Sequence, residues 1–170
     1  MELLNWKALL LAAFANFVVG SLWYNPKTFG PAWMREAGLT EESMKKGNMV
    51  KIFGFTLLFA LMLSTAIFPL VVHQMHLYSI CNHQLIGTDL AAKTMAEADI
   101  AGFMGKYGNE FRTFKHGAFH GLMFSIFLVL PIQGTNALFE GKSWKYIFIN
   151  AGYWALSLML MGGIISGWQK

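Results

Sequence analysis

Four apolar stretches long enough to cross a membrane constrain this chain more than any other feature. They lie at about residues 6–24, 52–72, 119–139 and 146–165, and almost no Asp, Glu, Lys or Arg interrupts them. The hydrocarbon core of a bilayer is about 30 Å thick, and about 20 helical residues cross it. We therefore expect an all-α integral membrane protein whose four spans form a four-helix bundle.

The rest of the chain leaves little room for a second domain. Four spans and their loops use most of the 170 residues, so we expect a single four-span membrane domain over residues 1–170. The loops should be short, except for one longer polar connector, residues 73–115, between helices two and three. A small-residue pattern at Ala13-Phe14-Ala15 fits a signal-peptide cleavage site. It lies inside the first apolar stretch, so we expect that stretch to be retained.

The basic residues are scattered over several loops. Cations beside anionic lipid head groups account for the net charge of +4, so the lipid bilayer is an expected partner and nucleic acid is not. Lys and Arg divide almost evenly between the two sides of the predicted membrane, with a slight excess in the first and third connections. Positive charge favours the cytoplasm, so this excess favours both termini outside it.

Small residues recur every fourth position in three of the four stretches. The residues predicted to pack helices together in this way are Ala12, Asn16, Gly20, Gly117, Gly121, Gly163 and Gly167. Such stripes let helix backbones approach closely, and this packing replaces the hydrophobic force that lipid cannot supply. The stripes could pair within one chain or between chains. The polar side chains Asn16 and Asn150 should make hydrogen bonds between helices.

Histidines are predicted to meet at one edge of the membrane. Four of them flank the connector, in two pairs with helical spacing: His73, His76, His116 and His120. Antiparallel helices two and three bring these pairs to the same side, where imidazoles could hold Zn²⁺, Cu or Ni²⁺, with Cys81 or Asp99 as a further ligand. The alternative is four structural histidines without a metal, which is the commoner role of such pairs.

Two motifs carry a resemblance to a known family. They are Gly20-Ser-Leu-Trp23-Tyr24-Asn-Pro26-Lys-Thr-Phe29-Gly30-Pro-Ala-Trp33-Met34, and Ala151-Gly152-Tyr153 followed by Met161-Gly162-Gly163-Ile164 and Trp168. Together they resemble the bacterial integral-membrane family catalogued as domain of unknown function 1761, over essentially the whole chain. The resemblance implies a multi-pass protein of the bacterial inner (cytoplasmic) membrane. It implies no activity, and the long connector with its flanking histidines looks like an elaboration on the family pattern.

The sequence indicates no catalytic residue. A nucleophile elbow, a phosphate-binding glycine loop and paired carboxylates are all missing, so we expect no enzyme and no cofactor. We expect a protein that acts by association, as an accessory subunit of other membrane proteins or through self-association as a homo-oligomer. One alternative is a metal-binding or metal-transporting protein that uses the histidine edge. A further alternative is a binder of lipid or another apolar small molecule, which would need a cavity between helices.

Overall fold

The structure is a computed structural model that describes residues 3–168. Within this range the chain forms helices and links without a strand, and four of its helices are long and apolar enough to cross a membrane. They are α1 (Trp6–Trp23), α4 (Met49–Val71), the continuous segment Phe114–Phe139, and α10 (Trp144–Gly167). The predicted all-α class and the four membrane-length helices are confirmed.

Three of these helices begin earlier than expected: α4 at Met49, the third membrane-length helix at Phe114 and α10 at Trp144. Asn48 caps α4 by accepting a hydrogen bond from the backbone of Lys51 (3.0 Å). Thr113 caps the third membrane-length helix in the same way, accepting from the backbone of His116 (3.2 Å). Such caps satisfy backbone N–H groups that a helix start leaves unpaired, and they lie upstream of the apolar residues that mark a span.

The third membrane-length helix changes its winding halfway. It consists of α8 (Phe114–Phe124), the π-helical segment η1 (Ser125–Val129) and α9 (Leu130–Phe139). Pro131 is the second residue of α9, just after the π-helical segment, and it has no backbone N–H to donate to the preceding turn. A widened turn is a common way to accommodate such a defect without breaking the helix.

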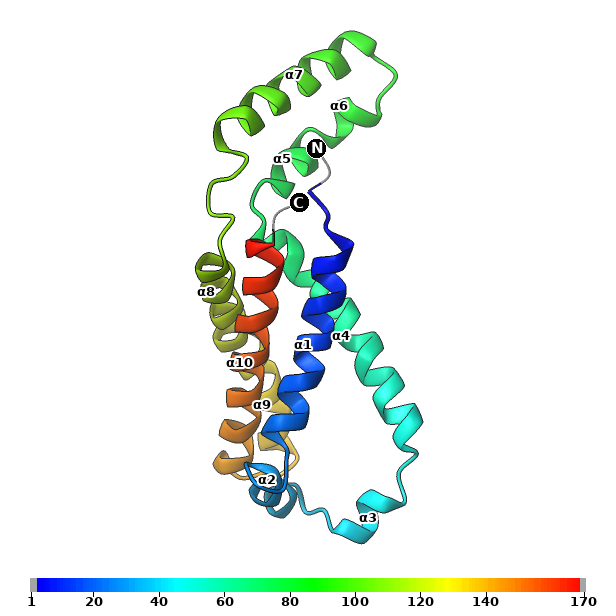
Figure 1. Cartoon of the computed structure of the whole chain (residues 1–170), viewed down its shortest axis with the longest axis vertical. Helices are drawn as coiled ribbons and strands as arrows, with labels where there is room; N and C mark the ends of the chain where they lie inside the picture. Colours follow the sequence, from blue (N-terminus) through cyan, green and yellow to red (C-terminus); the bar gives the residue numbers. More distant parts are fainter. Residues whose placement is uncertain (1–2, 169–170) are drawn as a thin grey trace.

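Helix α10 is the centre of the structure, with α1, α4 and α8 packed against it (Figure 1). Its side chains Leu158 and Met161 are fully buried, and they form one core with Leu9 of α1 and with Ile67 and Val71 of α4. Figure 1 shows the C-terminal half of α10 lying between α8 and α1, with α9 beside its N-terminal half. Since α10 follows α9 after a short turn, these two form an antiparallel hairpin.

Glycines bring α8 and α10 into backbone contact. A methyl group on Gly117 would overlap the carbonyl oxygen of Gly162, and one on Gly121 would overlap that of Leu158. Near the same end, Gly163 and Gly167 both face Phe114 at the start of α8. These predicted small-residue stripes therefore lie against another helix of the same chain.

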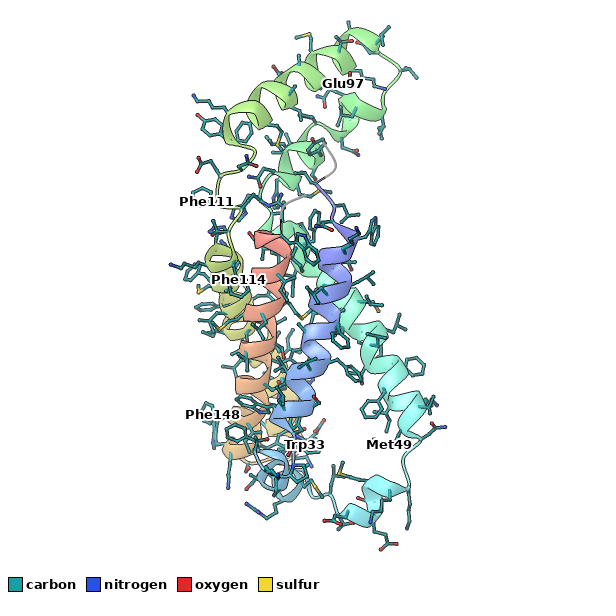
Figure 2. All side chains as sticks on the ribbon, viewed as in Figure 1. Trp33, Met49, Glu97, Phe111, Phe114 and Phe148 are labelled. Atoms are coloured by element: carbon teal, nitrogen blue, oxygen red, sulfur yellow. The ribbon has the colours of Figure 1, made fainter. Side chains whose placement is uncertain are left out.

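Helix α4 joins the other helices over only part of its length. Its buried side chains all lie in the second half, from Ala60 to Val71. The first half, which begins at Met49, diverges from the rest (Figures 1 and 2). Val50 there is 85% exposed and Phe59 is 60% exposed. The helices thus pack as a bundle at the end near His73 and open towards the other end.

The connections between the long helices are more structured than expected. The first one is not a short loop, because it contains α2 (Gly30–Ala37) and α3 (Glu41–Lys45). Lys142 Nζ donates to the carbonyl oxygen of Ala37 (2.8 Å) and so ties α2 to the turn before α10. The long connector folds into α5 (Met75–Ile80), α6 (Asn82–Ile86) and α7 (Leu90–Tyr107), which project beyond the bundle (Figure 1).

Candidate metal centre

The end of α4 and the start of α8 lie side by side and bring three histidines together. Helix α4 ends at Val71, and His73 follows directly in the link to α5. His116 and His120 lie one turn apart on α8, which contacts α4. The chain reaches α8 through Phe111, whose backbone adopts a left-handed conformation (φ 61°) that turns the link into the helix. Figure 2 labels Phe111 and Phe114 at this junction.

The three imidazoles are within reach of a single ion. His73 Nε2 lies 2.9 Å from His116 Nε2, and one ring donates while the other accepts. One nitrogen from each of His73, His116 and His120 can be chosen so that all three lie within 4.8 Å of one another. The ring centroids are 4.4–5.0 Å apart. In tetrahedral zinc sites, Zn–N distances of about 2.0–2.1 Å place ligand nitrogens about 3.3 Å apart, so small side-chain movements would close a site here.

The surroundings favour the neutral imidazole that a metal requires. The His73 side chain reaches solvent, but partial desolvation of its ring, followed by the neighbouring His120 and His76, holds its pKa below the ordinary value. His73 therefore offers a neutral nitrogen ligand near pH 7.

Aromatic rings surround the centre. The Phe111 ring lies 5.0 Å from that of His116 and 6.4 Å from that of His73, and the Phe119 ring lies 5.7 Å from that of His120. No Asp, Glu or Cys of the described chain joins the three histidines in this cluster. Three nitrogen ligands leave a fourth position of a tetrahedral ion open, and the exposed position of His73 lets water reach it.

The structure separates the fourth predicted ligand from the other three. His76 is the second residue of α5 and is not a member of the cluster. Its Nδ1 lies 3.2 Å from the carbonyl oxygen of His73. Cys81 lies between α5 and α6, and Asp99 lies on α7, also outside the cluster. The expected helical face of His73 and His76 is lost because α4 ends before them.

The other predicted packing residues lie at contacts of α1. Ala12 is fully buried, and Asn16 Oδ1 accepts a hydrogen bond from the Tyr153 hydroxyl (2.9 Å). Gly20 faces the ring of Tyr153, with room for a methyl group. Asn150 Oδ1 accepts a hydrogen bond from the hydroxyl of Tyr24, the residue that ends α1 (2.8 Å). Asn16 and Asn150 therefore both take part in hydrogen bonds that link α1 to α10.

Sequence reasoning missed Phe111 and Gly162. A bulky residue with positive φ has no sequence signal, because glycine and asparagine are the residues that usually mark that conformation. Gly162 precedes the predicted packing residue Gly163 in the sequence. In the structure it is Gly162 whose backbone contacts that of Gly117.

The fold and the cluster together define a helical membrane protein with four membrane-length helices and a histidine group where two of them meet. The chain belongs to the family described as protein of unknown function (DUF1761), whose sequence profile matches residues 7–166. The match over residues 7–166 confirms the family that the two sequence motifs predicted. Comparisons with curated proteins and with solved structures gave no match.

Proposed function

We propose that this protein binds a divalent transition-metal ion at the membrane edge through His73, His116 and His120. The observation that carries the proposal is the convergence of three imidazole nitrogens from two helices within 4.8 Å. Zinc, copper and nickel accept imidazole ligands readily, and Zn²⁺ is the simplest ion to test, since it needs no particular oxidation state.

Binding, rather than transport, is the role we propose for this centre. Carriers of ions usually place ionisable groups near the middle of the membrane, and the four apolar stretches have none there. The cluster instead lies where α4 has ended and α8 begins. We also propose that the bilayer is the bacterial inner membrane, as the family resemblance implies.

Metal analysis of the protein purified in mild detergent tests the proposal. We expect about one Zn²⁺ per chain, and we expect His116→Ala to weaken the affinity by at least about tenfold, or 1.4 kcal/mol. His76→Ala is the matched control, because that side chain neighbours the cluster without belonging to it. A parent protein that binds no Zn²⁺, Cu or Ni²⁺, or a His116→Ala variant that binds as well as the parent, would refute the proposal.

Association is the second candidate function, as an accessory subunit or a homo-oligomer. It is supported by the first half of α4, which exposes Val50, Phe55 and Phe59 and which α1 contacts through the ring pair Phe17–Phe53. The small-residue stripes no longer support it, because they pack inside the chain. We propose this half of α4 as the contact surface for a second membrane protein.

Crosslinking in native membranes tests the second candidate. In a Cys81→Ser background, Phe55→Cys should crosslink to a partner or to a second copy, whereas Phe148→Cys, exposed on α10, should not. Equal crosslinking at the two positions, or none at Phe55→Cys, would remove its support.

A further inference from the structure

An open groove of about 540 Å³ follows the seam where α1 packs against α10. One wall runs along α1 from Leu11 to Trp23, and Leu156 and Leu160 of α10 belong to the other. Phe29, just beyond α1, closes the end. From Leu11 to Trp23 the helix rises about 18 Å, which is close to half of a bilayer core about 30 Å thick. The groove therefore matches the length of an acyl chain in one leaflet.

The wall of this groove offers an occupant apolar contacts. Among its described residues, only Trp23 and Thr28 carry a polar side-chain atom, and both atoms are bonded to the backbone. Trp23 Nε1 donates to the carbonyl oxygen of Ile149 (3.0 Å), and the Thr28 hydroxyl donates to that of Leu22 (2.6 Å). Since α1 and α10 are of membrane length, hydrocarbon surrounds this surface. A hydrocarbon chain fits such a wall, because it requires no hydrogen bond.

A second open cavity adjoins the groove and carries a cation. Its wall includes Trp23 and Phe29, which also line the groove, and Lys145 in the first turn of α10. The rings of Trp23 and Phe29 are stacked with their centroids 4.4 Å apart, and they form the wall that the two cavities share. Trp144, next to Lys145, is 62% exposed, and tryptophan is enriched at the level of lipid head groups. The second cavity therefore lies where the head group of a lipid in the groove would lie.

The ammonium group of Lys145 is accessible to a further anion. It lies 3.6 Å from Glu36 Oε1, and the Lys145 side chain is 57% exposed. An exposed ion pair of this kind contributes little, and Glu36 Oε2 already accepts from the Ser143 hydroxyl. Cations exceed acids in the segments at this end, residues 24–38 and 140–145, which carry Lys27, Arg35, Lys142 and Lys145 against Glu36 and Glu140. This end of the groove is therefore electropositive and complements a negatively charged head group.

We propose that the seam between α1 and α10 is a binding site for one anionic phospholipid. An acyl chain lies in the groove along α1, and the phosphate lies beside Lys145. A head group with a net negative charge gains more from this cation than a zwitterionic one does. The site lies at the end of the bundle opposite to the three histidines, beside α2 (Figure 1). It therefore does not depend on a bound metal.

The probes are dioleoylphosphatidylglycerol and dioleoylphosphatidylcholine, which share their acyl chains and phosphate but differ in net charge. Native mass spectrometry of the full chain in mild detergent counts the bound lipids and measures the affinity for each probe. We expect one phosphatidylglycerol per chain, bound about fivefold more tightly than phosphatidylcholine. Equal affinities for the two lipids would overturn the recognition of an anionic head group.

Two tryptophan variants of α1 test the groove. Val18 lines the groove, so Val18→Trp fills part of it and should weaken the binding of both lipids by about fivefold or more. Leu10→Trp is the matched control, because Leu10 is exposed on the same helix but does not line the groove. Unchanged phosphatidylglycerol affinity in Val18→Trp would overturn the site. A dimer of the parent that Val18→Trp dissociates would also overturn it, because a second copy would then fill the groove.

Two glutamine variants test the head-group contact without altering the groove. Lys145→Gln should abolish the fivefold preference for phosphatidylglycerol and leave the affinity for phosphatidylcholine unchanged. Lys51→Gln, which removes an exposed cation from the first turn of α4, should keep the preference. Circular dichroism should give the same helix content for the parent and all four variants, so that lost binding is not lost folding. A preference that survives Lys145→Gln would overturn the contact between Lys145 and the head group.

Discussion

The hydroxyl of Tyr153 on α10 donates to Oδ1 of Asn16 on α1, with 2.9 Å between the two oxygens. Both side chains are buried, at 8% and 3% exposure, inside helices of membrane length. Lipid offers neither group a substitute partner, so this bond helps to set which faces of α1 and α10 meet. It also explains why an asparagine interrupts the alanine and glycine stripe of α1.

Tyr153→Phe should lower the free energy of unfolding by about 1 kcal/mol, because Asn16 then keeps a buried acceptor without a partner. Denaturation in mixed micelles with sodium dodecyl sulfate measures this. Asn16→Ala should cost a similar amount, and the double variant should cost less than the two changes added together. Full additivity would show that the two residues do not act through this bond.

Gly117→Ala should destabilise the protein by about 1–3 kcal/mol, because the new methyl group overlaps the carbonyl oxygen of Gly162 and forces α8 and α10 apart. The same unfolding assay measures it. Gly54→Ala is the matched control, since nothing lies within 4 Å of a methyl group there. Equal effects at the two glycines would contradict the close approach of α8 and α10.

Zn²⁺ affinity should hardly change between pH 7 and 8 and should fall below about pH 6.5, the ordinary pKa of histidine. The pKa of His73 is lowered in the folded protein, so the folded chain binds this proton more weakly than the unfolded chain does. Protonation of His73 therefore opposes both metal binding and folding. The Zn²⁺ affinity and the free energy of unfolding should both decrease as the pH falls below about 6.5. Zinc titrations from pH 5 to 8 measure the first effect, and a constant affinity over that range would exclude histidine ligands.

Ser143→Ala should act at two places. The hydroxyl caps α10 by accepting from the backbone of Tyr146 (3.1 Å), and it donates to Glu36 Oε2 (2.5 Å). Loss of the cap should cost about 1 kcal/mol. Loss of the donated bond should raise the pKa of Glu36 towards its ordinary value, because that bond is the main reason why it is lowered.

Carboxyl titration by nuclear magnetic resonance measures the Glu36 pKa, and Glu36→Gln serves as the comparison that leaves the cap in place. An unchanged Glu36 pKa in Ser143→Ala would show that Lys145, 3.6 Å away, dominates instead.

The long apolar stretches made the membrane helices predictable, since length and composition are local properties of the chain. The pairing of His116 with His120 was predictable for the same reason, because both lie within one helix. The choice of His73 over His76 was not, because it depends on where α4 stops. Val72 ends the helix with a ψ of 85°, and Pro69, which lies inside the last turn, does not tell from sequence whether the helix stops before or after His73.

The divergence of α4 was also hidden from the sequence. Residues that face lipid and residues that face another helix are equally apolar, so Phe55 and Ile67 look alike although only Ile67 is buried. The glycine contacts were predictable only in part. Their spacing predicted close packing, but the identity of the facing helix depends on the fold.

Helix α4 is packed into the core near Ile67 and Val71, whereas Val50 near its start is largely exposed. Because His73 follows the packed end, a sideways displacement of the exposed half would tilt that end and move His73 relative to His116 and His120.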